Sequence, residues 1–187
     1  MKELSLNILD IVENSVKARA ANIGIDLDER EKGRLVLTIT DDGCGMTEEI
    51  LRRVTDPFYT TRTTRPVGMG LSLLKLAAEQ TGGGMTVESI SETVSPDKHG
   101  TVVRAEFFTD HIDCVPLGDV TSTLTTLIHG SPDIDFHYTH RFGDDSMVEL
   151  DTVQLRTVLE DVPLNSFEVL QWIEAFVNEQ YSEIHNQ

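Results

Sequence analysis

The sequence predicts an α+β fold in which a mixed sheet is covered by helices on one face. Three patterns support this prediction. Apolar residues recur at helical spacing in several stretches, short runs of β-branched residues alternate with polar positions, and helices and strands are interleaved along the chain. The 187 residues and an apolar content of 39% suffice for one packed domain with a smaller appendage.

The first half of the chain contains the clearest elements. Leu4, Ile8, Ile11, Val12 and Val16 recur at helical spacing and predict a helix over 4–20. Gly82–Gly84, where glycine can adopt a positive φ angle, are predicted to end a later helix. The remaining elements predicted here are strands at 23–29, 35–40, 85–90 and 101–108, a short helix beginning at Thr47, and a longer helix at 70–81.

The second half begins near residue 110, where the composition changes. Residues 120–128 predict a helix, although their threonines are weak helix formers. Residues 134–142 alternate as a strand does, with Ile134, Phe136, Tyr138 and Phe142 on one face, and a turn leads into a second strand at 147–150. Asp151 is positioned to cap a helix through about 161, and Asn165 with Glu168 resembles a capping box before a final helix.

We therefore predict two regions, 1–109 and 110–187. The second region is either a small α+β unit or an intimate extension of the first. Its charge distinguishes it, because it holds 15 of the 32 acidic residues but only 2 of the 15 basic ones. The net charge of −17 argues against nucleic acid as a partner. It favours solubility or, alternatively, docking of a protein with a basic face through the extension.

Other features exclude several classes of protein. The first twenty residues contain no long apolar run, so we predict neither a signal peptide nor a membrane span and expect a cytoplasmic protein. Cys44 and Cys114 have no metal-site or disulfide spacing, and Cys114 is expected to be inert unless the nearby His111 makes it redox-sensitive.

The first candidate site motif lies on the helix at 4–20. Asp10, Asn14 and Lys17 are spaced so that they share one helical face, away from the apolar stripe. A solvated helix face is the simplest explanation. Alternatively, the amide oxygen suits Mg²⁺, the carboxylate one turn earlier suits a general base, and the lysine one turn later suits a phosphate.

The second motif, DDGCGM at 41–46, follows directly on a predicted strand. Asp41 is an acceptor that can receive a hydrogen bond from an exocyclic amine such as that of adenine. Gly43 and Gly45 leave room for a flat ring or permit a tight turn. A plain turn is the alternative interpretation.

The third motif, PVGMGLSLLK at 66–75, places Gly68 and Gly70 before a helix. The unpaired N–H groups of a helix start bind anions readily. Arg62 and Arg65 precede it in a polar loop, where guanidinium groups are suited to a triphosphate. The alternative is a solvated loop with ordinary charges.

Together and in this order, the motifs resemble the gyrase, Hsp90, histidine-kinase and MutL (GHKL) superfamily of ATPases. ILDIVENSVKARA resembles its N box, DDGCGM its G1 box, DPFYTTR its F box and GMGLSLLK its G2 box, while TGGGMTVES and HGTVVRAEF resemble its closing strands. The resemblance covers residues 1–109 and is closest to the histidine-kinase branch. It implies a two-layer Bergerat-type α/β sandwich with ATP and Mg²⁺ as cofactors.

The resemblance also implies roles for individual residues. Asp41 would hold the adenine amine above Gly43 and Gly45, Asn14 would hold Mg²⁺, and Asp10 would be the catalytic base. Phe58 would pack under the lid, and Thr101 would lie near the adenine. The whole predicted cofactor-binding set is Asn14, Lys17, Asp41, Gly43, Gly45, Met46, Phe58, Arg62, Arg65, Gly68, Met69, Gly70, Leu71 and Thr101.

Two departures from the family pattern affect the expected function. Asp10 stands where the hydrolytic branches have a glutamate, and Glu13 is the other candidate base, although it points some 100° away from Asn14. We expect no phospho-accepting hairpin before the N box, and none of the six histidines lies in the family's acceptor sequence. His137 and His140 are expected on opposite faces of a strand, which disfavours a shared metal site.

We therefore expect a stand-alone ATP-binding protein that phosphorylates or regulates a separate partner in trans, as the resemblance to anti-sigma serine kinases implies. One alternative is a nucleotide-switched binding module with little catalysis, whose partner the resemblance suggests to be a redox enzyme complex such as a hydrogenase. A second is ATP hydrolysis coupled to dimerisation, as in MutL. Whether the chain is an enzyme, its oligomeric state and the identity of the partner stay open from sequence.

Overall fold

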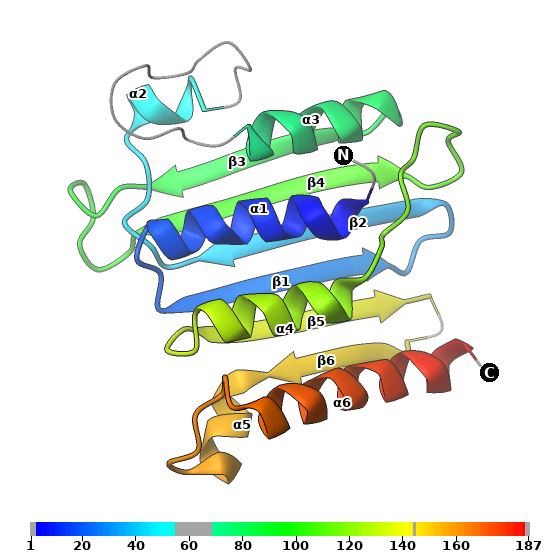
Figure 1. Ribbon diagram of the computed structural model, residues 1–187. Coiled ribbons are helices and arrows are strands. Elements are labelled where there is room, and N and C mark those ends of the chain that lie inside the picture. Colours follow the sequence, from blue (N-terminus) through cyan, green and yellow to red (C-terminus); the bar gives the residue numbers. More distant parts are fainter. Residues whose placement is uncertain (1–2, 55–68, 144, 186–187) are drawn as a thin grey trace.

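The computed structural model describes residues 3–54, 69–143 and 145–185, and Figure 1 shows their arrangement. The six strands and six helices of these residues follow the predicted order, and their boundaries differ from the predicted ones by only a few residues. The helices are α1 (Leu4–Lys17), α2 (Glu48–Leu51), α3 (Gly70–Gln80), α4 (Val120–Gly130), α5 (Thr152–Leu159) and α6 (Phe167–His185). The strands are β1 (Asn22–Glu29), β2 (Arg34–Asp41), β3 (Gly84–Ile90), β4 (Gly100–Phe108), β5 (Asp135–Phe142) and β6 (Met147–Asp151).

The strands form one six-stranded sheet in the order β3-β4-β2-β1-β5-β6. All neighbouring pairs are antiparallel except β1 and β5, which run parallel over eight residue pairs. The sheet is therefore mixed, and the strands after residue 109 belong to the same sheet as those before it. Of the two arrangements that the sequence left open for the second region, the strand pairing is that of an intimate extension.

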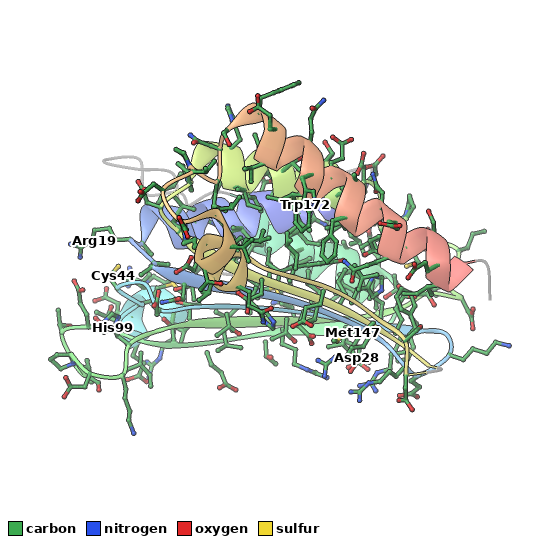
Figure 2. The ribbon with its side chains drawn as sticks, turned by 90° about the horizontal axis from the view of Figure 1, so that it is seen from below. Arg19, Asp28, Cys44, His99, Met147 and Trp172 are labelled. Atoms are coloured by element: carbon green, nitrogen blue, oxygen red, sulfur yellow. The ribbon has the colours of Figure 1, made fainter. Side chains whose placement is uncertain are left out.

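The long helices lie on one face of the sheet, as Figure 2 shows, and the other face carries the partly exposed Asp28 and the exposed Met147. The α+β fold with helices on one face is thus confirmed. The alternation along the strands explains this arrangement, because Ile23, Ile25 and Leu27 of β1 are buried while the residues between them are partly exposed.

Local signals fix the helix starts. Asp119 accepts a hydrogen bond from Ser122 N at the start of α4, and the predicted cap Asp151 accepts from Val153 N and Gln154 N at the start of α5. The first helix ends at Lys17, three residues earlier than predicted, because Arg19 adopts a positive φ of 63°.

The extension is held to the sheet by α6. Ile173 and Val177, two residues of α6, are fully buried in the core. The side-chain amide of Gln180 receives a hydrogen bond from Glu149 N and donates one to Glu149 O, each 3.0 Å long. This pair occupies the backbone groups in the middle of the edge strand β6, which would otherwise be open to pairing with another chain.

Candidate functional site

The predicted site residues of α1 lie on its exposed side. Asp10 is exposed and Asn14 is half-buried, and within the described part of the chain neither side chain takes part in a hydrogen bond or an ion pair. Lys17 is 68% exposed and lies 3.5 Å from the carboxylate of Glu13, one turn earlier. Asp10 and Asn14 are therefore free to contact a ligand, whereas Lys17 has a competing partner.

Asp41 ends β2, where it is paired with Ile23 of β1 and Thr101 of β4. Its Oδ2 accepts a 2.6 Å hydrogen bond from Ser15 Oγ, and its Oδ1 accepts a 2.9 Å bond from Gly43 N. Because each carboxylate oxygen has two lone pairs, both oxygens retain capacity for a further donor. The two bonds orient the Asp41 carboxylate and leave lone pairs on both oxygens for a ligand.

The next residue, Asp42, has a structural role. It accepts hydrogen bonds from Ala21 N, Asn22 N and the Asn22 side-chain amide, at 2.7–2.9 Å. Burial raises the pKa of Asp42, but these bonds lower it by more, so the net pKa lies below the ordinary value. The charged Asp42 thus ties the end of β2 to the segment that connects α1 with β1.

The loop that follows Asp42 is fixed at both sides. A side chain at Gly43 would meet Ala18, and one at Gly45, where φ is +64°, would lie 1.9 Å from Ile90 O. Cys44 N donates to Ala18 O, and His99 Nδ1 lies 2.6 Å from Gly43 O. Figure 2 shows Cys44 and His99 at the same end of the molecule. Glycine is therefore required at both positions by close backbone packing, in addition to the turn.

Ser89 links Met46 and Thr101, two residues of the predicted cofactor-binding set. The sequence analysis did not identify Ser89 as a site residue. Ser89 Oγ accepts from Met46 N at 2.8 Å, lies 2.9 Å from Thr101 Oγ1 and donates to Gly100 O. Ser15, which donates a hydrogen bond to Asp41, is the other residue of the candidate site that the sequence analysis missed. Ser15 follows the predicted Asn14 directly, but it points some 100° away on the helix and is buried.

The first turn of α3 packs directly against α1. A Cβ added to Gly70 would lie 3.2 Å from Asp10 Cβ, so Gly70 permits the close approach. Leu71 is buried in the core, and Met69, which precedes the helix, is 64% exposed. The structure therefore brings the start of α3 next to the predicted base Asp10. The predicted site residues Phe58, Arg62, Arg65 and Gly68 lie outside the described residues.

A family model described as "Histidine kinase-, DNA gyrase B-, and HSP90-like ATPase" matches residues 2–111. This match covers more than half of the chain and contains all three candidate motifs. The chain belongs to this ATPase family. The GHKL membership expected from the sequence is confirmed, and it implies that the protein binds ATP.

Curated relatives in this ATPase family include several kinases. Sporulation kinase E of Bacillus subtilis (strain 168) is 32% identical over 91 residues, which are 48% of this chain and 12% of the relative. Sensor histidine kinase ZraS of Salmonella typhimurium is 31% identical over 85 residues, which are 44% of this chain and 18% of the relative. The chain thus matches less than a fifth of the length of either protein.

Solved structures support the fold of this chain. The N-terminal domain of a DNA repair protein superposes with a TM-score of 0.56, covering 81% of this chain and 53% of that chain at 16% identity. The Aquifex aeolicus MutL ATPase domain, solved with ADP, superposes with a TM-score of 0.53 at 12% identity. The superposition covers 86% of this chain and 70% of that chain. The coverage extends beyond residue 111, so part of the extension belongs to the shared architecture.

No helix within the described ranges is both long and apolar enough to cross a membrane.

Proposed function

We propose that this protein binds Mg²⁺-ATP at the end of β2 and uses it to phosphorylate or regulate a separate protein. The observation that carries the proposal is the position of α1. Its buried side presents Ser15 to Asp41, and its exposed side presents Asp10 next to Gly70. The three motifs, separated by up to sixty residues in sequence, therefore meet along one helix.

The adenine end of the proposed site is formed by β2 and its neighbours. Asp41, oriented by Ser15 and Gly43 N, would accept the exocyclic amine of adenine. Thr101 is paired with Asp41 across the sheet and would lie beside the same ring. Ser89 supports this wall through its bonds to Met46 N and Gly100 O.

The phosphate end would be formed by α1 and the start of α3. The unengaged amide of Asn14 suits Mg²⁺, which would neutralise phosphate charge during transfer. The free N–H groups at the start of α3 would bind phosphate oxygens. Lys17 would contribute by exchanging Glu13 for a phosphate.

In the proposed reaction, an acceptor hydroxyl or imidazole attacks the γ-phosphorus while the bond to the β,γ-bridging oxygen breaks and ADP leaves. Asp10 would take the proton that the acceptor loses. A partner protein is the expected acceptor, because none of the six histidines lies in the family's acceptor sequence. The kinases among the relatives are consistent with transfer to protein.

The test is incubation of the purified protein with γ-labelled ATP and Mg²⁺, alone and with cell lysate. Asp41→Asn should abolish ATP binding, and Asp10→Asn should retain binding but lose transfer. Glu13→Gln is the matched control, because it removes the alternative base from the same helix and should transfer label normally. Unchanged ATP affinity in Asp41→Asn would overturn the site, and lost transfer in Glu13→Gln alone would move the base to Glu13.

A second candidate function is a nucleotide-switched binding module. The observation that favours it is the shared strand β1, which pairs with Asp41 through Ile23 on one side and with the acidic extension through β5 on the other. Nucleotide binding would then be communicated to the extension as a docking unit, with a redox enzyme complex such as a hydrogenase as one type of partner. Tight ATP binding without transferred label or released phosphate would establish this function instead.

A further inference from the structure

A cavity lies at the other end of β1, away from the proposed nucleotide site. It has a volume of about 370 Å³ and is lined by residues from β1, β5, the start of α4 and α6. Glu29 is the last residue of β1, whereas Asp41 is paired with Ile23 near its first residue. Six residues of extended strand separate the two sites by about 20 Å.

The lining of this cavity carries two carboxylates. Glu29 and Asp119 line it, and the described lining residues include neither lysine nor arginine. Asp119 Oδ1 accepts a hydrogen bond from Ser122 N to cap α4, and within the described residues Oδ2 takes part in no hydrogen bond. The Glu29 side chain is 34% exposed, and its Oε1 lies 3.6 Å from Nε2 of His140.

His140 supplies the observation that points to a ligand. Its side chain is 3% exposed, and within the described part of the chain Nε2 has no hydrogen-bond partner. The 3.6 Å separation from Glu29 Oε1 is too long for a hydrogen bond. A buried polar atom without a hydrogen-bond partner is rare and energetically costly. Because His140 lines the cavity, a ligand bound there could bring a hydrogen-bond partner to Nε2.

The tautomer of His140 follows from its neighbours. Tyr138 Oη lies 2.5 Å from Tyr181 Oη, which lies 2.8 Å from His140 Nδ1. The arrangement that gives both hydroxyl protons an acceptor has Tyr138 donating to Tyr181 and Tyr181 donating to Nδ1. Nδ1 is then an acceptor, so the neutral ring carries its proton on Nε2 and adds no positive charge to the cavity.

Aromatic rings form the remaining wall. Phe142 stacks on His140 with ring centroids 4.2 Å apart, and Tyr181 meets Phe142 edge-on. Two carboxylates beside aromatic faces form a suitable environment for an organic cation, which gains ion pairing and cation–π attraction together. An anion would be repelled by Glu29 and Asp119.

We propose that this cavity binds a primary ammonium or guanidinium group through the carboxylates of Glu29 and Asp119 and the rings of Phe142 and Tyr181. The bound cation would hold Glu29 where His140 Nε2–H can donate to it, which supplies the missing hydrogen bond. The same chemistry belongs to a free alkylamine and to a lysine or arginine side chain of a basic protein. The site is separate from the proposed nucleotide site and does not depend on its function.

The experiment is a titration of the ¹⁵N-labelled protein with n-butylammonium, n-butylguanidinium and a blocked tripeptide with a central lysine, followed by NMR. n-Butanol and butyrate are the neutral and anionic controls. We expect saturable shifts at His140 and Asn178 with the cations only, and a proton on Nε2 of His140 from its ring ¹⁵N shifts. Binding of the free amines indicates a small-molecule site, and binding of the tripeptide alone indicates a partner's side chain.

Variants make the result specific. Glu29→Gln should weaken cation binding roughly tenfold or more, since it removes one ion pair from a partly dehydrated site. Glu174→Gln makes the same charge change on the exposed side of α6 and should leave the affinity unchanged. Phe142→Leu tests the aromatic wall if Glu29→Gln fails to fold. The absence of saturable shifts with every cation, or equal affinity in Glu29→Gln, would overturn the proposal.

Discussion

Ser15 Oγ donates a 2.6 Å hydrogen bond to Asp41 Oδ2, joining α1 to the end of β2. Ser15 is 4% exposed, so the bond lies at the edge of the core, where competition from water is weak. Asp41 would therefore keep one orientation with and without a nucleotide. The relationship couples the helix that carries Asp10 and Asn14 to the carboxylate that would hold adenine.

Ser15→Ala should weaken ATP binding roughly tenfold, because a hydrogen bond to a charged group typically contributes about 1.5–3 kcal/mol. The fold should persist, since alanine suits both the helix and the buried position. Isothermal titration calorimetry with ATP measures the effect. Ser182→Ala, which removes a hydroxyl from the exposed side of α6, is the control. Wild-type affinity in Ser15→Ala would show that this bond does not orient the site.

Gly45→Ala should abolish ATP binding. The added methyl group would lie 1.9 Å from Ile90 O, and the φ of +64° costs a non-glycine residue about 1–2 kcal/mol before the clash is counted. The loop therefore has to move away from the β3–β4 end of the sheet. Gly130→Ala is the matched control, because a Cβ there meets nothing within 4 Å. Both variants are compared by ATP titration and thermal melting, and normal ATP binding by Gly45→Ala would contradict the packing argument.

Much of the fold could be predicted from local patterns. Three features depend only on residues close in sequence: the apolar spacing of α1, the alternation in β1 and the cap Asp151. They could therefore be predicted without knowledge of the tertiary structure. The position of Asp41 at a strand end was predictable for the same reason. The description of a helix-covered mixed sheet followed from the interleaving of these elements.

Residues that act through distant partners were harder to predict. The sequence placed Ile134, Phe136, Tyr138 and Phe142 on one face of a strand but did not assign His140 to it, although the alternation requires this. Burial of the His140 ring requires a hydrogen-bond partner for Nδ1, and that partner is Tyr181, 41 residues later in the chain. Ser15 was missed because its acceptor, Asp41, is 26 residues away.

The parallel pairing of β5 with β1 could not be predicted at all from the strand pattern. Alternation identifies the buried face of a strand but not its neighbour in the sheet. The sequence accordingly left open whether the acidic region was a separate unit. Eight paired residues and the packing of α6 instead join it to the ATPase fold.

Ile173→Ala should destabilise the whole protein, and not the extension alone. Ile173 is fully buried in the core, where removal of such a side chain typically costs about 2–5 kcal/mol. Because β5 is paired with β1 along its full length, we expect one cooperative unfolding transition. Urea denaturation followed by circular dichroism and by the fluorescence of Trp172 measures this. Val158→Ala, at an 80% exposed position, should change the stability by less than about 0.5 kcal/mol.

Two transitions that differ between circular dichroism and Trp172 fluorescence would contradict this expectation. They would mean that α6 separates from the sheet before the ATP-binding region unfolds. The extension would then be an independent unit in solution despite the shared sheet.

The tyrosine pair predicts a loss of stability in alkali. Burial raises the pKa of Tyr181 to about 12, the hydrogen bond from Tyr138 lowers it, and the charge of Glu29 raises it. Burial raises the pKa of Tyr138 still further. Unfolded tyrosines ionise near pH 10, so the folded protein retains protons that the unfolded chain has lost. The stability that these hydroxyl groups contribute is therefore complete below pH 10 and decreases as the pH rises towards about 12.

Tyrosinate absorbance in a Tyr59→Phe background measures this prediction, because the two remaining tyrosines are then Tyr138 and Tyr181. We expect little ionisation near pH 10 while the protein is folded, followed by a rise that coincides with unfolding. Tyr181→Phe in the same background should reduce the dependence of the unfolding free energy on pH between 10 and 12, since it removes one of the retained protons. If both hydroxyl groups ionise near pH 10 in the folded protein, the Tyr138–Tyr181–His140 chain is open to solvent, and the Nε2–H tautomer assigned to His140 has lost its basis.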